Sequence, residues 1–284
     1  SPEKRREIRD AASKAGLKID IHSPIVGPYA PFPDPRKGKQ LFFDPLKSFD
    51  LQCETIELAH DLGAGAVVIH LIDPSDPARM AELVARARGT SVRVTFENYC
   101  QTSCRQSSEP YLACLEEIMA HLEEDVVRDN FGITLDVGHL NIEGEDPLLG
   151  AERIGLWCQA RGVPLRLHAT DNYGRHLFSP PAYSADVHSN VSGRGINNTA
   201  IIKLLRSMGH RFDVVAEQIQ PLTREDILLI HEAQTSPLEG TYESWVSKGR
   251  DALDRLGFEP LIPPSVREKK PYLFLAGLFG IPAL

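Results

Sequence analysis

The sequence contains no long uninterrupted hydrophobic run. A membrane-spanning helix needs about 20 consecutive apolar residues, and the most apolar stretch, PYLFLAGLFGIPAL at 271–284, is shorter and is interrupted by glycine and proline. The first ten residues, SPEKRREIRD, are charged and helical in pattern, which is not the pattern of a signal peptide. We therefore expect a cytoplasmic protein with no membrane partner.

Positive charge and regularly spaced cysteines are also scarce. The chain has 31 Lys plus Arg against 39 Asp plus Glu, for a formal net charge of −8. A broad cationic surface for nucleic-acid phosphates is therefore not expected. The five cysteines lack zinc-ribbon spacing, and Cys100 and Cys104 alone are weak evidence for a metal or a disulfide. This pattern favours a reduced compartment.

Six short segments have the length and alternation of β-strands. They are residues 17–22, 66–71, 92–97, 133–137, 165–169 and 213–218. Segments with helical periodicity lie between them, at 48–63, 77–88, 110–127 and 197–209. Strands that alternate with long helical crossovers are parallel. The sequence therefore predicts an α/β protein with a parallel sheet.

The side chains within these strands sort into an apolar face and a polar face. In segment 17–22 the polar face carries Lys18, Asp20 and His22, and segments 92–97 and 165–169 alternate in the same way. An open sheet with helices on both faces would be apolar on both, whereas a barrel needs only its outer face apolar. The alternation favours a (β/α)8 TIM barrel over a Rossmann-like sheet.

The number of strands bears on the domain organisation. A full barrel has eight strands, and only six can be counted. Because the chain opens in a helical pattern, we interpret the first strands as missing from this chain, with a closing strand at 271–279 as the alternative. We expect a single barrel domain over 1–258 and a C-terminal extension over 259–284.

The last inward-facing residue of each predicted strand is a potential metal ligand or acid–base group. These residues are His22, His70, Glu97, Asp136, His168 and Glu217. Three more candidates are His139, which follows Asp136 closely, and Asp186 and His188 in SADVHSNVSGRG. One such histidine is usually an ordinary hydrogen-bonding residue, but six polar strand ends at the mouth of a barrel predict a metal centre. Imidazole and carboxylate without thiolate suit Zn²⁺, Mn²⁺, Fe²⁺ or Co²⁺.

These motifs resemble the xylose isomerase-like TIM barrels, a superfamily of sugar isomerases and epimerases that also includes the endonuclease IV-type AP endonucleases. The matching pieces, in family order over about 17–218, are IDIHSP, LGAGAVVIHL, VTFEN, GITLDVGH, LHATDN, DVHSNVSGRG and VVAEQ. The resemblance implies that Glu97, Asp136, His168 and Glu217 hold the single divalent metal of a ketose epimerase. It also implies additional ligands where the endonucleases complete a three-metal cluster: His22, His70, His139, Asp186 and His188.

Two departures argue against a DNA-cleaving member. The endonucleases carry Asp-Thr-Cys-His where this chain has Asp136-Val137-Gly138-His139. The loop from Asp171 to Asp186 is longer here and carries three aromatic residues, which suits closure over a small ligand. The acidic net charge agrees, since a DNA enzyme should present a basic rim.

We therefore interpret the chain as a metal-dependent isomerase or epimerase of a small sugar or sugar-like substrate, acting through a metal-stabilised enediolate. Glu97 and Glu217 would exchange the proton beside the substrate carbonyl, as the epimerase resemblance implies. The other expected site residues are His188 as a further catalytic group and Arg194, Asp171 and Asn98 as substrate-binding groups. One ion is expected, and up to three could be held.

Two other enzyme classes remain open. One is a multinuclear phosphoesterase of the endonuclease IV type, in which Asp186 and His188 hold an extra ion. The other is a metal-dependent sugar lyase or dehydratase. About one ion per chain would favour the isomerase, and two or three would favour phosphoester hydrolysis. A small carbohydrate is the expected partner, nucleic acid is not, and a homo-oligomer is left open.

Overall fold

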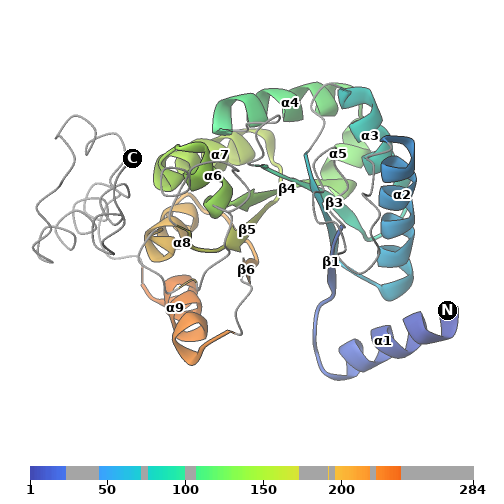
Figure 1. The fold of residues 1–284 in the computed structure, drawn as a ribbon, viewed down its shortest axis with the longest axis horizontal. Helices are drawn as coiled ribbons and strands as arrows, with labels where there is room; N and C mark the ends of the chain where they lie inside the picture. The colour runs from blue at the N-terminus through green and yellow to red at the C-terminus, as the bar shows by residue number, and fades with distance from the viewer. Residues whose placement is uncertain are drawn as a thin grey trace, which may run out of the picture. The chain divides into compact units, whose positions relative to one another are not determined.

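The computed structural model describes residues 1–23, 45–71, 76–99, 107–172, 191, 196–217 and 222–237. Its strands are β1 (Asp20–His22), β2 (Ala66–His70), β3 (Arg93–Glu97), β4 (Phe131–Asp136), β5 (Leu165–Ala169) and β6 (Val214–Ala216). Its helices are α1 (Pro2–Lys14), α2 (Pro45–Leu62), α3 (Pro77–Arg86), α4 (Ser108–Ala120), α5 (Glu124–Asn130), α6 (Val137–Glu143), α7 (Pro147–Arg161), α8 (Asn198–Ser207) and α9 (Arg224–Thr235). Strands and helices alternate along the chain, as the colours of Figure 1 show.

The strands form a six-stranded sheet in which their order follows the chain, from β1 to β6. The pairs β1–β2, β2–β3 and β5–β6 are parallel. A parallel neighbour requires a crossover connection, and helices supply it here, as in β2–α3–β3 and β5–α8–β6. The predicted parallel α/β architecture is confirmed.

The chain folds as two compact units, residues 1–97 with 113–133 and residues 98–112 with 134–284. In the first unit, Val67 and Ile69 of β2 and Val94 and Phe96 of β3 are fully buried, and α2 and α3 contact these strands. In the second unit, α6 contacts β5, whose Leu167 is fully buried, and α7, α8 and α9 contact one another in turn. The apolar faces predicted from the alternation are therefore the faces that pack.

Several element boundaries differ from those predicted. β1 begins at Asp20 rather than at residue 17, and Leu17 is 67% exposed. The helix expected at 110–127 is two helices, because Glu123 is extended and ends the helical hydrogen-bonding before α5. β4 lies at 131–136 rather than 133–137, because Val137 already begins α6.

Charged residues at the starts of the strands are satisfied in two ways. Arg166 of β5 lies 3.4 Å from the carboxylate of Asp213, an ion pair in which the Asp213 side chain is half exposed. Arg93 of β3 instead donates to the carbonyls of Phe131, at 2.6 Å, and Arg128, at 3.2 Å. Burial lowers the pKa of Arg93 from its ordinary value, against the opposing effect of the Asp129 carboxylate. Backbone carbonyls thus compensate a half-buried guanidinium.

Several expectations fall outside the described residues. These include the C-terminal extension at 259–284, the closing strand considered at 271–279, and Cys100 with Cys104. Of the described cysteines, Cys53, Cys114 and Cys158 are buried thiols. Within the described ranges, no helix combines the length and the apolarity that crossing a membrane would require.

Candidate metal centre

Strands β1, β2 and β3 of the first unit each end in a residue predicted as a ligand. The register pairs His70 with Glu97, and places His22 opposite Val68, two residues before His70. The bonds from the Ser23 amide to Val68 O and from the Leu71 amide to Glu97 O extend the pairing past the strand ends. Parallel pairing therefore brings side chains from distant parts of the sequence to one end of these strands.

Two imidazoles lie against one carboxylate oxygen in this unit. The Nε2 atoms of His22 and His70 are 3.1 Å and 3.4 Å from Oε2 of Glu97. The two rings are 4.8 Å apart between centroids. Glu97 is fully buried, His70 nearly so, and the His22 side chain is 33% exposed. A fully buried carboxylate of this kind requires compensating charge or hydrogen bonds.

The hydrogen bonds of His22 define what its second nitrogen can do. Nδ1 lies 2.9 Å from the Ser23 carbonyl oxygen, an acceptor, so Nδ1 carries a proton and donates it. A neutral imidazole then has its lone pair on Nε2, which faces the acceptor Oε2 of Glu97. Two acceptors at this distance need a proton or a metal cation between them.

In the second unit, Asp136 and His139 occupy the turn from β4 into α6. Asp136 is the N-cap of α6, and its Oδ1 accepts a 2.7 Å hydrogen bond from the His139 amide. Both side chains are almost completely buried. The His139 ring donates from Nδ1 to the carbonyl of Asn98, at 2.7 Å, which puts its lone pair on Nε2. A metal-binding histidine is commonly held by such a bond from its other ring nitrogen.

β5 and the residue after β6 contribute a second imidazole–carboxylate pair. Nδ1 of His168 lies 2.6 Å from Oε2 of Glu217. The Glu217 amide donates to Ala169 O, so the pairing of β5 with β6 continues to this point. The His168 side chain is buried and that of Glu217 is 26% exposed.

The predicted substrate-binding residues have different outcomes. Asp171 and Asn98 are buried, and the Asn98 amide bonds to the backbone of Asp136. Arg194, Asp186 and His188 lie outside the described residues. Among the residues described, the structure thus groups His22 and His70 with Glu97 in one unit, and Asp136 with His139 and His168 with Glu217 in the other.

Sequence reasoning missed a set of buried asparagines in the second unit. Asn172 donates to Gly138 O at 3.0 Å, and Asn141 donates to Asn172 Oδ1 at 2.8 Å. Asn198 donates to Thr170 O at 3.0 Å. These amides connect the ends of β4 and β5 to the helices that follow. No periodicity identifies them, because their partners are backbone groups distant in sequence.

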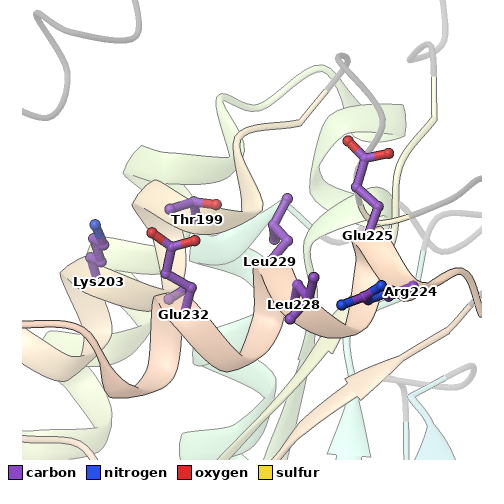
Figure 2. Close-up of a pocket in the computed structure, with 8 residues that line it drawn as sticks. Thr199, Lys203, Arg224, Glu225, Leu228, Leu229 and Glu232 are labelled. Carbon is purple, nitrogen blue, oxygen red and sulfur yellow. The ribbon is translucent and has the colours of Figure 1, made fainter.

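A hollow of about 670 Å³ lies elsewhere in the second unit, between α8 and α9 (Figure 2). Its lining residues all come from these two helices, and include Lys203, Arg224, Leu228 and Glu232. No predicted site residue within the described ranges lines it. Strand ends, not this hollow, therefore carry the candidate chemistry.

Comparison with known protein families supports the barrel fold predicted from the sequence. The family whose sequence profile matches residues 1–233 is described as xylose isomerase-like TIM barrel. The chain belongs to this family. The six parallel strands and their helices therefore form part of a (β/α)8 barrel, as predicted. Comparison with curated proteins gives no match.

Solved structures of the xylose isomerase-like kind share the fold at low identity. A D-tagatose 3-epimerase-like protein is 18% identical, with 89% of this chain and 86% of that chain covered, at a TM-score of 0.56. A xylose isomerase domain protein from Planctomyces limnophilus is 16% identical, with 90% and 84% covered, at 0.52. An IOLI protein with a bound zinc atom is 15% identical, with 89% and 83% covered, at 0.50.

The imidazole and carboxylate donors of the present chain fit a divalent metal ion. Two atoms that each lie about 2.0–2.2 Å from one ion are about 3 Å from each other in tetrahedral or octahedral geometry. The His22–Glu97, His70–Glu97 and His168–Glu217 distances are 3.1, 3.4 and 2.6 Å. Imidazole nitrogens and carboxylate oxygens without sulfur suit Zn²⁺, Mn²⁺, Fe²⁺ or Co²⁺.

Proposed function

We propose that this chain is a divalent-metal-dependent isomerase or epimerase of a small sugar or sugar-like molecule. The observation that carries the proposal is the imidazole–carboxylate pair of His168 and Glu217, whose Nδ1 and Oε2 atoms lie 2.6 Å apart. Such a pair of atoms needs a proton or a metal cation between them, and it stands at strand ends in a member of the xylose isomerase-like barrels. The names of the structural neighbours, an epimerase-like protein and a xylose isomerase domain protein, support the substrate class.

In this proposal Glu97, Asp136, His168 and Glu217 hold one ion. When bound, the ion acts as a Lewis acid toward the substrate carbonyl and the hydroxyl beside it. The ligands would come from four strand ends. This sharing explains the long gaps between them in the sequence.

The proton transfer is assigned to two carboxylates. One of Glu97 and Glu217 takes the proton from the carbon beside the carbonyl, and the other returns a proton to the neighbouring carbon or to the opposite face. Return of the proton to the neighbouring carbon is isomerisation, and its return to the opposite face of the same carbon is epimerisation. Neither reaction consumes an oxidant or a reductant. Glu217, which is partly exposed, is accessible to substrate. His188, Arg194 and Asp171 are assigned to substrate orientation.

Metal content tests the ligand set directly. Protein purified without chelator should contain about one Zn²⁺, Mn²⁺, Fe²⁺ or Co²⁺ per chain by elemental analysis. Glu97→Gln and Asp136→Asn should each weaken metal binding by at least about tenfold, since each removes a charged ligand. Asp226→Asn is the matched control, because Asp226 is equally buried but caps α9. The metal content of this variant should equal that of the unsubstituted chain. Unchanged metal in both ligand variants would refute the proposal.

Solvent exchange tests the reaction class. Incubation with candidate ketoses in D₂O should incorporate deuterium at the carbon beside the carbonyl, detected by NMR, because a carboxylate base exchanges its proton with solvent. Glu217→Gln should abolish this incorporation. Exchange-free conversion, or no conversion of any ketose, would contradict the isomerase assignment.

A second candidate is a multinuclear phosphoesterase. The observation that favours it is the pair of imidazoles, His22 and His70, on Oε2 of Glu97, which supplies donors for a further ion. Two to three ions per chain, with hydrolysis of a phosphate ester and no exchange in D₂O, would replace the isomerase with this function.

A further inference from the structure

Asn98 follows the last residue of β3, and its side chain is completely buried. Its Nδ2 donates to the Asp136 carbonyl at 2.9 Å, and its Oδ1 accepts from the Asp136 amide at 2.8 Å. The side chain thus makes the pair of bonds that a backbone residue would make in a strand ladder. Both ends of the amide are engaged with one residue, the last of β4.

The backbone of Asn98 contacts a second candidate ligand. Its carbonyl accepts the 2.7 Å hydrogen bond from Nδ1 of His139, and the adjacent Tyr99 ring packs edge-on against the His139 ring at 5.9 Å. The His139 amide in turn bonds to Oδ1 of Asp136. Asn98, Asp136 and His139 therefore close a ring of hydrogen bonds in which each residue restrains the other two.

We propose that Asn98 is a positioning residue, which holds Asp136 and His139 in the geometry that binds the metal, rather than a residue that contacts substrate. The inference rests on the proposed function only in that it requires a metal at Asp136. Its physical basis is that a buried amide with two good hydrogen bonds is costly to move. A carboxylate whose backbone is fixed loses less conformational entropy on binding an ion.

The test compares two buried asparagines at opposite ends of β4. Asn130 precedes β4, is 2% exposed and donates to the carbonyls of Ala87 and Val92, both at 2.9 Å. Asn98→Ala and Asn130→Ala each remove a buried amide that bonds to the backbone. Both should lower the melting temperature. In calorimetric titration of the apoprotein with Zn²⁺, only Asn98→Ala should weaken binding, by about 10- to 100-fold.

A second substitution covers the case in which Asn98→Ala does not fold. Asn98→Asp keeps the shape and the acceptor for the Asp136 amide but loses the donor to its carbonyl. The added carboxylate would by itself attract a cation, so weaker Zn²⁺ binding by this variant supports positioning. Equal or tighter binding by Asn98→Asp would overturn the inference, as would equal losses of affinity in Asn98→Ala and Asn130→Ala.

The two proposals fail in different ways. If the unsubstituted chain binds no divalent ion, the proposed function fails, and the positioning role fails with it. If the chain binds the ion and catalyses no isomerisation, the affinity comparison still decides the role of Asn98. If the chain is active and Asn98→Ala binds Zn²⁺ normally, only the positioning role is lost.

Discussion

Gly138 leaves no room for a side chain. A Cβ atom there would lie 2.4 Å from Cγ2 of Thr170, 2.7 Å from Nδ2 of Asn172 and 3.0 Å from Oδ1 of Asp136. A glycine after a strand often serves a turn, through its freedom to adopt positive φ. The structure instead places Gly138 inside α6, apart from the glycines with positive φ. Close approach of Thr170 and Asn172, which follow β5, to the first turn of α6, and not backbone freedom, is the reason for the glycine.

Gly138→Ala should therefore destabilise the protein, although alanine is ordinarily the better helix former. Overpacking of a buried contact typically costs about 1–3 kcal/mol, measurable as a lower urea midpoint. Thr170→Ser removes the nearest methyl group, so it should recover part of the loss in the double variant. Gly155→Ala in α7 is the control, because the two atoms nearest its Cβ would be flexible ends, Leu205 Cδ2 and Met208 Sδ, both at 2.9 Å, with His210 Nε2 at 3.5 Å. An equal cost for both glycines would contradict this explanation.

At the scale of elements, α9 depends on its first turn. Thr223 and Asp226 form a reciprocal capping box: Thr223 Oγ1 accepts from the Asp226 amide at 3.1 Å, and Asp226 Oδ2 accepts from the Thr223 amide at 2.9 Å. Ile227 and Leu228 on this helix are more than half exposed. Because part of the apolar surface of α9 lies outside the core, tertiary packing stabilises this helix less. Its N-terminal cap therefore contributes a larger share of the stability of the helix.

Thr223→Ala should lower the free energy of unfolding by about 1 kcal/mol, the usual cost of losing a side-chain N-cap. Hydrogen exchange should show the loss as faster exchange of the amides in α9. Thr235→Ala, at the exposed C-terminal end of the same helix, removes only a bond to the His231 carbonyl and should change little. Similar losses from both threonines would show that the capping box is not what stabilises α9.

At the scale of the whole molecule, the ligands proposed for the ion span positions 97 to 217 of the chain. An ion that binds them only when the strands are formed stabilises the folded state by mass action, by about 2.7 kcal/mol at free metal 100-fold above Kd. For a domain of this size each kcal/mol corresponds to about 2–4 °C. A bound ion would therefore link the stability of the fold to occupancy of the site.

Removal of metal with EDTA should lower the melting temperature by several degrees, and added Zn²⁺ or Mn²⁺ should restore it. In Glu97→Gln the melting temperature should not respond to EDTA or to added ion, because a ligand is missing. If EDTA has the same effect on Glu97→Gln as on the unsubstituted chain, the ion that stabilises the protein is bound elsewhere.

Much of the architecture could be predicted from local patterns. The alternation in RVTFE and LRLHA places β3 and β5, and it identifies Glu97 and His168 as polar residues at the strand ends. The helix break at Glu123 and the start of α6 at Val137 could not be predicted in this way. Both lie in stretches whose residue pattern fits a continuous element, and local periodicity does not record where that element ends.

The sequence by itself determined the class of fold and the chemistry of the strand ends, because side-chain alternation is a local property of an extended backbone. Only the tertiary structure decided which polar atoms meet. Asn98 and Asp136 are 38 positions apart, and Gly138 is close to Thr170 only after β5 has packed against α6. Contacts of this kind depend on the closure of long loops around a common core, and no periodicity in the chain records them.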